Sequence, residues 1–222
     1  MDNLTSDQIH NAVASRYSGL ACCCTSLSCG AALDVAEPAN GEVFVDLGCG
    51  RGQDVIRAAG RVGSSGVAIG VDLSEDMLAK ARASVPPFLA NTRFVRSDLE
   101  KLDLADGFAD VLISNCTINH APDKLAVYKE IHRVLKPGGR FVVSDVIANE
   151  RLPESVRNDP AAWAACYGGA IPEEEYLAAV RDAGFCGVEV VTRSESYEKG
   201  TVMVRSLTLR AFREPNHTGD LR

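Results

Sequence analysis

The sequence predicts an α/β domain in which a mostly parallel sheet carries helices on both faces. From residue 43 onward, short runs rich in Val, Ile and Phe alternate with helical segments, an order typical of parallel strands joined by crossover helices. A glycine-rich turn at residues 48–52 joins the first strand to the helix that follows it. The last two strands flank a short polar segment, which indicates an antiparallel pair.

The N-terminal part, residues 1–40, is expected to form a lid. Residues 5–18 predict a helix, because Thr5 and Gln8 have the spacing of a capping box. Residues 20–40 have neither helical nor strand periodicity and predict a mobile loop. This loop holds four of the eight cysteines of the chain: Cys22, Cys23, Cys24 and Cys29.

The domain itself is expected over residues 41–213. Its predicted parallel strands are residues 43–47, 67–71, 93–95, 109–114 and 140–145. The predicted helices between them are residues 52–61, residues 74–84, and one that begins at Pro122 and ends at the Lys136-Pro137-Gly138-Gly139 turn. Right-handed crossovers follow for strands connected in this way.

The region after the fifth strand is expected to hold an insertion that binds the substrate, residues 147–171. A helix follows over residues 172–183 and ends at Gly184, and strands are predicted at residues 187–192 and 201–212. Residues 214–222 predict a disordered tail.

Composition limits the classes of partner. The net charge of −7 and the pI near 5.1 oppose binding of nucleic acid, since phosphate contacts need clustered Lys and Arg. No apolar run approaches the roughly 20 residues that cross a membrane, and the first residues lack the features of a secretory signal. These observations predict a cytoplasmic protein whose cysteines serve as thiols, ligands or catalytic groups rather than disulfides.

The glycine turn, Asp46-Leu47-Gly48-Cys49-Gly50-Arg51-Gly52, indicates a cofactor site. Glycines let the backbone approach a ligand at a strand-to-helix turn, and Asp72, twenty residues after Gly52, can accept hydrogen bonds from ribose hydroxyls. A dinucleotide pattern would have Gly or Ala where Gln53 stands, although a nicotinamide-binding domain stays open. Taken alone, the glycines could form only a turn, and Asp72 could only cap a helix.

The sequence resembles class I S-adenosylmethionine methyltransferases in three motifs. These are the Gly-x-Gly-x-Gly turn, Ser97-Asp98-Leu99 and Lys136-Pro137-Gly138-Gly139. The resemblance implies a Rossmann-like, seven-stranded sheet with an antiparallel last strand, and S-adenosylmethionine as cofactor. The cofactor residues that it implies are Asp46, Gly48, Gly50, Gly52, Asp72, Leu73, Met77, Asp98, Leu99 and Asn115.

Two further stretches resemble the arsenite S-adenosylmethionine methyltransferases: residues 114–124, Ser-Asn-Cys-Thr-Ile-Asn-His-Ala-Pro-Asp-Lys, and residues 151–170, which include Cys-Tyr-Gly-Gly-Ala. The resemblance implies that Cys116 and Cys166 hold trivalent arsenic for methylation. Cys29 is the implied third ligand, because Cys29-Gly30 resembles the family's Gly-Cys-Gly element, and Cys22, Cys23 or Cys24 could replace it.

Thiolates suit trivalent arsenic, because it is a soft ion. A thiol reductant such as glutathione or thioredoxin is the expected partner. Two alternatives stay open: methylation of a small organic molecule, for which His120 is the one nearby candidate base, and metalloid binding without transfer. His120, which stands where relatives tend to have Leu, is expected at the surface or on a helix.

Overall fold

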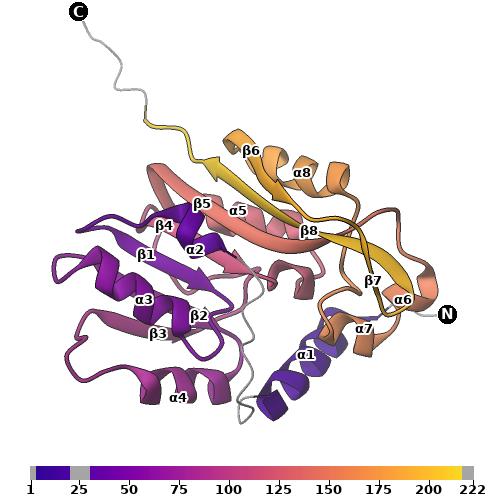
Figure 1. The fold of residues 1–222 in the computed structure, drawn as a ribbon, viewed down its shortest axis with the longest axis horizontal. Helices are drawn as coiled ribbons and strands as arrows, with labels where there is room; N and C mark the ends of the chain where they lie inside the picture. The colour runs from indigo at the N-terminus through magenta and orange to yellow at the C-terminus, as the bar shows by residue number, and fades with distance from the viewer. Residues whose placement is uncertain (1–3, 21–30, 217–222) are drawn as a thin grey trace, which may run out of the picture.

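A computed structural model of the chain describes residues 4–20 and 31–216, and one twisted sheet forms its centre (Figure 1). The strands are β1 (Val43–Leu47), β2 (Val67–Asp72), β3 (Thr92–Arg96), β4 (Ala109–Asn115), β5 (Leu135–Ala148), β6 (Cys186–Arg193), β7 (Tyr197–Lys199) and β8 (Val202–Phe212). The sheet order is β3-β2-β1-β4-β5-β8-β6, with β7 also paired to β8. Strands β1 to β5 are parallel, and β8 is antiparallel to both β5 and β6.

The predicted fold class is confirmed, with one difference in the strand count. The short strand β7 pairs with β8 through Tyr197 and Val204, so the described residues form eight strands instead of seven. β5 is also longer than predicted, because its pairing with β8 continues to Ala148.

Helices cover both faces of the sheet. They are α1 (Ser6–Leu20), α2 (Ala32–Ala36), α3 (Gln53–Val62), α4 (Glu75–Ser84), α5 (Lys124–Val134), α6 (Glu154–Arg157), α7 (Pro160–Ala164) and α8 (Glu173–Asp182), with a 3-10 turn η1 (Ile118–His120). Successive strand residues point to opposite faces, so Phe44 packs with α2, α3 and α4 in one core cluster. Val45 belongs to the second core cluster, with α5 and α8.

Local hydrogen bonds set where the helices begin. The Thr5 and Gln8 capping box is confirmed: the Gln8 N–H donates to Thr5 Oγ1 at 3.3 Å, and the Thr5 N–H donates to Gln8 Oε1 at 2.9 Å. Ser74 caps α4. The predicted start of the next helix at Pro122 was wrong, because Asp123 accepts from the Ala126 N–H at 3.0 Å and α5 begins after that cap.

The prediction of a loop throughout residues 20–40 was also wrong. The five-residue helix α2 buries Ala32, Leu33 and Ala36 against the sheet. Such a helix is too short to show the 3.6-residue period by which helices are recognised in a sequence. Cys22, Cys23, Cys24 and Cys29 lie outside the described residues.

The region of the predicted insertion contains α6 and α7. It has its own small apolar cluster, which includes Leu152 and Val156, and α7 packs against α1 (Figure 1). This contact joins two segments far apart in the chain beside the carboxyl ends of the parallel strands.

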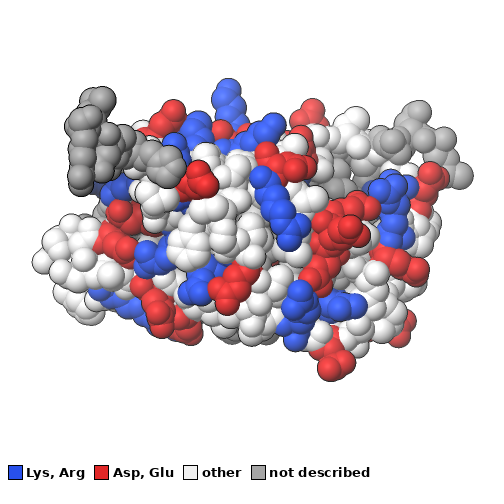
Figure 2. All heavy atoms as spheres, turned by 90° about the horizontal axis from the view of Figure 1, so that it is seen from above, with Lys and Arg blue, Asp and Glu red and all other residues white. Residues whose placement is uncertain are grey.

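The surface carries charges of both signs. Figure 2 shows Lys and Arg interspersed with Asp and Glu on the face in view, and many form pairs, such as Arg210 Nη2 with Glu189 Oε2 at 2.7 Å. Among the described residues, no helix combines the length and the apolar character that a membrane crossing requires.

Candidate functional site

A cleft lies at the carboxyl ends of β1, β2 and β4, the edge at which open α/β sheets bind ligands. The loops after these strands form most of its wall, and α1 contributes His10, Val13, Ala14 and Tyr17. These four side chains recur at the spacing of one helical face. That spacing is present in the sequence, but these four residues were not predicted to form part of a site.

Most of the predicted cofactor residues line this cleft. The structure places Asp46, Gly48, Gly50, Asp72, Leu73, Asp98, Leu99 and Asn115 in its wall. Gly52 and Met77 are not in the wall. Gly52 caps α3 with φ 75°, and the Met77 side chain is fully buried.

The glycine turn fits closely between two neighbouring segments. Gly48 has φ +74°, and a Cβ built there would lie 2.1 Å from Thr117 Oγ1. Its N–H donates to the Val71 carbonyl at 2.8 Å. The turn therefore holds the loops after β1, β2 and β4 together, which explains the need for glycine at this position.

We expect Gly48→Ala to lower the free energy of unfolding by about 2–4 kcal/mol, because it adds left-handed strain and a steric overlap with Thr117. Urea denaturation measures the change. Gly50→Ala is the matched control: Gly50 has φ +51°, but a Cβ there has no atom within 4 Å, so only the strain of about 1–2 kcal/mol applies. Equal losses in the two variants would contradict the close fit at Gly48.

Asp72 ends β2 with its carboxylate in the cleft wall. Its Oδ2 accepts from the Gly50 N–H at 2.8 Å, and its Oδ1 accepts from the Ser74 N–H at 2.9 Å. Each oxygen keeps one lone pair for a ligand. Burial raises the pKa of Asp72, while the N–H groups of Ser74 and Gly50 counteract that rise. The residue therefore holds the glycine turn and can still accept hydroxyl groups of a ribose.

The floor of the cleft is acidic. Asp46 is 4% exposed, and burial raises its pKa well above the usual range, with the charges of Asp54 and Asp72 adding to the rise. Asn115 Nδ2 donates to Asp54 Oδ2 at 3.1 Å, whereas the buried Asn115 Oδ1 has no hydrogen-bond partner among the described residues. Such a floor suits a ligand that carries positive charge and N–H donors.

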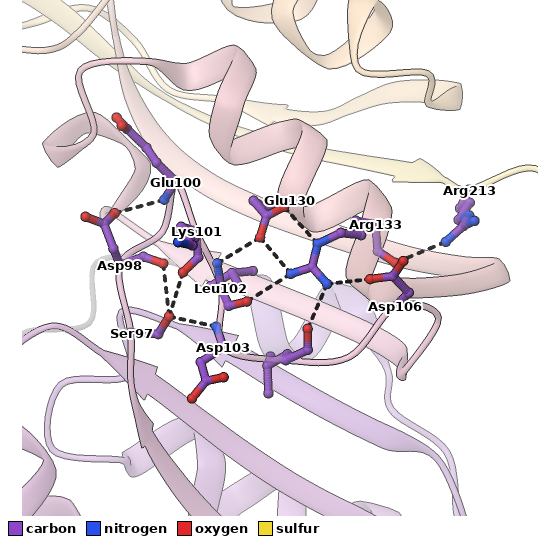
Figure 3. A network of polar contacts seen from close by, with 11 residues as sticks. Ser97, Asp98, Glu100, Lys101, Leu102, Asp103, Asp106, Glu130, Arg133 and Arg213 are labelled. Carbon is purple, nitrogen blue, oxygen red and sulfur yellow. Dashed lines mark hydrogen bonds and ion pairs between the residues drawn. The ribbon is translucent and has the colours of Figure 1, made fainter.

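The loop after β3 places Asp98 at one end of the cleft. Asp98 Oδ1 accepts from the Glu100 N–H at 2.9 Å, and Asp98 Oδ2 lies 3.6 Å from His10 Nδ1 on α1. Figure 3 shows how α5 holds the rest of this loop. Arg133 donates to the carbonyls of Leu102 and Leu104 at 2.9 and 2.8 Å. The position of Asp98 therefore depends on a polar network that reaches α5.

The two cysteines that the sequence singled out lie on adjacent segments. Cys166 Sγ lies 3.2 Å from the Cys116 carbonyl oxygen, although the two residues are 50 positions apart. Cys116 lines the cleft, and the buried Cys166 contacts residues that line it. The structure thus brings the two cysteine segments together, and the role of the two sulfurs as arsenic ligands stays a prediction.

Both cysteines also have an unusual backbone. Among residues 4–20 and 31–216, the non-glycine residues with positive φ are Glu37, Cys116 and Cys166, with φ of 55° and 65° at the two cysteines. Residues rarely adopt this conformation unless the surrounding structure imposes it, and it is enriched at functional sites. Here the Cys116 N–H donates to the Ser144 carbonyl at 2.7 Å.

His120 and Tyr17 surround the Cys166 sulfur. His120 Nε2 lies 2.9 Å from Cys166 Sγ, and Tyr17 Oη lies 3.3 Å from the same sulfur and 3.2 Å from Nε2. Of the two expected positions for His120, at the surface or on a helix, the first was wrong: the residue is 7% exposed and ends the 3-10 helix η1. Tyr17 was missed because its partners are 103 and 149 positions away.

The protonation of this cluster follows from its surroundings. Burial lowers the pKa of His120 to about 4, so the imidazole is neutral. Its Nδ1 lies 2.9 Å from the Trp163 carbonyl, which can only accept, so Nδ1 carries the proton and Nε2 is an acceptor. Burial raises the pKa of Tyr17, and Cys166 adds to the rise.

The third sulfur that the sequence implied, Cys29, lies outside the described residues. Within the part of the chain that the structure describes, no group of three or more His, Cys, Asp or Glu residues is placed to hold a metal ion. The described site therefore consists of two cysteine segments beside a cleft with an acidic floor.

The chain is similar to known methyltransferases. A family model described as a methyltransferase domain matches residues 38–184. The arsenite methyltransferase of Halobacterium salinarum is 40% identical over 78% of this chain and 44% of its own length. The arsenite methyltransferase of Aquipseudomonas alcaligenes is 37% identical over 93% of this chain and 61% of its own length. This chain thus spans about half the length of the curated relatives it matches.

A solved structure agrees with these matches. The arsenic (III) S-adenosylmethionine methyltransferase from Chlamydomonas reinhardtii superposes with a TM-score of 0.75 at 29% sequence identity. The match covers 97% of this chain and 76% of that one. The described fold therefore occurs in a protein of known structure.

Proposed function

The chain belongs to the methyltransferase-domain family, and we propose that it transfers the methyl group of S-adenosylmethionine to trivalent arsenic held by cysteine sulfurs. The proposal depends above all on the meeting of the two cysteine segments beside the cleft, with Cys166 Sγ 3.2 Å from the Cys116 carbonyl. The arsenite methyltransferases among the relatives support the choice of substrate.

The residues of the cleft fit S-adenosylmethionine. Asp72 would accept the ribose hydroxyls, and Asp98 and Leu99 would contact the adenine. The acidic floor at Asp46 and the unpartnered Asn115 Oδ1 would receive the ammonium group and lie near the sulfonium. The bound cofactor supplies an electrophilic methyl group on a positively charged sulfur.

Cys116 and Cys166 would hold the arsenic through sulfur, because thiolates are the protein ligands that suit a soft ion. Cys29 would be the third ligand, with Cys22, Cys23 or Cys24 as replacements. Three sulfurs would leave the arsenic with one lone pair, which is the nucleophile. Glutathione or thioredoxin, in a reducing cytoplasm, would keep the thiols available.

In the proposed reaction, the protein acts chiefly by positioning the methyl donor and the arsenic relative to each other. Methyl transfer from a sulfonium is an in-line displacement that needs the two reacting atoms about 3–3.5 Å apart, with little acid–base help. The cysteines fix one reactant and the cleft fixes the other. The side chains of α1, including Val13 and Tyr17, form part of the wall and exclude water there.

The test is to incubate the purified protein with S-adenosylmethionine, arsenite and a thiol reductant, and to separate arsenic species by chromatography coupled to mass spectrometry. We expect methylated arsenic that requires both S-adenosylmethionine and arsenite. Arsenic binding without product would instead indicate a metalloid-binding protein. If no arsenic binds while S-adenosylmethionine does, a small organic acceptor becomes the better explanation.

A further inference from the structure

We propose that Asn119 and Gly169 set the distance between the two cysteine sulfurs and are therefore positioning residues for arsenic binding. The inference rests on the proposed function and adds to it the contact that holds the two ligands in place. Asn119 stands three residues after Cys116, and Gly169 stands three residues after Cys166. Both residues are buried and neither lines the cleft, so they act through the cysteine segments.

The backbones of the two cysteine segments touch at this pair. A Cβ built at Gly169 would lie 2.1 Å from the carbonyl oxygen of Asn119 and 2.5 Å from Cζ3 of Trp163. Gly169 does not belong to the glycines with positive φ, so glycine is needed here for space and not for its backbone conformation. The segment of Cys166 therefore approaches η1 as closely as a residue without a side chain allows.

The contact at Gly169 is tied to Cys166 through Trp163. The Cys166 N–H donates to the Trp163 carbonyl at 3.0 Å, and the ring of the same tryptophan lies against Gly169. The ring is fixed in turn, because its Nε1 donates to the Arg157 carbonyl at 2.8 Å. A displacement at Gly169 would therefore move Cys166 with it.

The Asn119 side chain holds the segment of Cys116 to β5. Its Nδ2 donates to the Val146 carbonyl at 2.5 Å and lies 3.5 Å from the Cys166 carbonyl. The Cys116 N–H donates to the same strand, to the Ser144 carbonyl at 2.7 Å. Because β5 lies within the sheet between β4 and β8, it is a fixed reference for the positions of both cysteines.

The spacing matters because two sulfurs that share one ion must be held at the right distance. The groups of a binding site must lie within about 0.5 Å of the productive geometry. A methyl group at Gly169 would need about 3.4 Å from the Asn119 carbonyl oxygen instead of 2.1 Å. The two segments would then separate by about 1 Å, a displacement that costs about 100-fold when it affects reacting groups.

The variant Gly169→Ala tests this spacing, and Gly66→Ala is its matched control. A Cβ built at Gly66 would lie 2.6 Å from the Glu42 carbonyl oxygen and 2.7 Å from the Val62 Cβ, and Gly66 also lacks a positive φ. It directly precedes β2, at the end of the strands opposite the cleft. The control thus adds the same methyl group against a backbone carbonyl, away from both cysteine segments.

Equilibrium dialysis without S-adenosylmethionine measures the dissociation constant of arsenite, and calorimetry measures that of S-adenosylmethionine. We expect Gly169→Ala to weaken arsenite binding about 10- to 100-fold, and X-ray absorption at the arsenic edge to show fewer As–S bonds than in the wild type. Its affinity for S-adenosylmethionine should stay within about 2-fold of the wild type, and Gly66→Ala should leave both constants within about 2-fold, since distant sites respond independently.

Equal arsenite affinity in Gly169→Ala and Gly66→Ala would overturn the inference while leaving the proposed function intact. A loss of S-adenosylmethionine binding as large as the loss of arsenite binding would also overturn it, because it indicates general disruption. Failure of the wild-type protein to retain arsenite after gel filtration would instead overturn the proposed function, and the inference with it.

A second variant applies if circular dichroism shows that Gly169→Ala is unfolded. Asn119→Ala adds no steric overlap and removes the Nδ2 donor to the Val146 carbonyl. We expect it to weaken arsenite binding about 10-fold, the usual effect of losing a buried hydrogen bond. An unchanged arsenite affinity in this variant contradicts the inference in the same way.

Discussion

Replacing Cys166 with serine should lower the rate of arsenic methylation by at least about 100-fold while S-adenosylmethionine still binds. A hydroxyl is a harder and less acidic ligand than a thiol, so it does not hold trivalent arsenic. Misplacing a reactant by about 1 Å already costs about 100-fold, and loss of a ligand costs at least as much. Cys116→Ser should behave in the same way.

Product formation in single-turnover reactions measures this effect, with calorimetry to follow the cofactor. Cys186→Ser is the matched control, because the Cys186 thiol donates to the Phe212 carbonyl at 3.3 Å, on β6 and away from the cleft. Methylation by Cys166→Ser at the wild-type rate would show that this sulfur does not bind the substrate.

Replacing Asp72 with asparagine should weaken S-adenosylmethionine binding about 10- to 100-fold. The carboxylate accepts from the Gly50 and Ser74 N–H groups and would also accept from the ribose, and an amide has one acceptor oxygen for all of these. A hydrogen bond to a charged group contributes about 1.5–3 kcal/mol, and 1.4 kcal/mol corresponds to a tenfold change in affinity.

Isothermal titration calorimetry measures the dissociation constant. Asp76→Asn removes the same charge from an exposed position in the first turn of α4 and should leave the constant within about 2-fold. Arsenite binding should survive in Asp72→Asn, since the cysteines are untouched. If Asp72→Asn binds S-adenosylmethionine as tightly as Asp76→Asn does, the ribose role of Asp72 is wrong.

The parts of the site that the sequence predicted are those determined by local chemistry. Gly48 and Gly50 directly after a strand predict a turn from local sequence alone, and Asp72 ends the next strand at the same edge of the sheet. The two cysteines were recognised through the stretches around them, and the structure then brought those stretches together.

The parts that the sequence did not predict depend on contacts between distant residues. His120 was expected at the surface or on a helix, and its burial could not be predicted because its partners Tyr17, Trp163 and Cys166 are far from it in the sequence. The helix α2 and the strand β7 are too short for periodicity to reveal. In each case, tertiary packing determines the structure, and the pattern of nearby residues in the sequence does not reveal it.

Anomalous diffraction at the arsenic absorption edge, from crystals soaked with arsenite, shows which atoms hold the arsenic. We expect one anomalous peak within bonding distance of both Cys116 Sγ and Cys166 Sγ, beside the cleft that Asp72 lines. Arsenic bound elsewhere, or bound to only one of these two sulfurs, would contradict it.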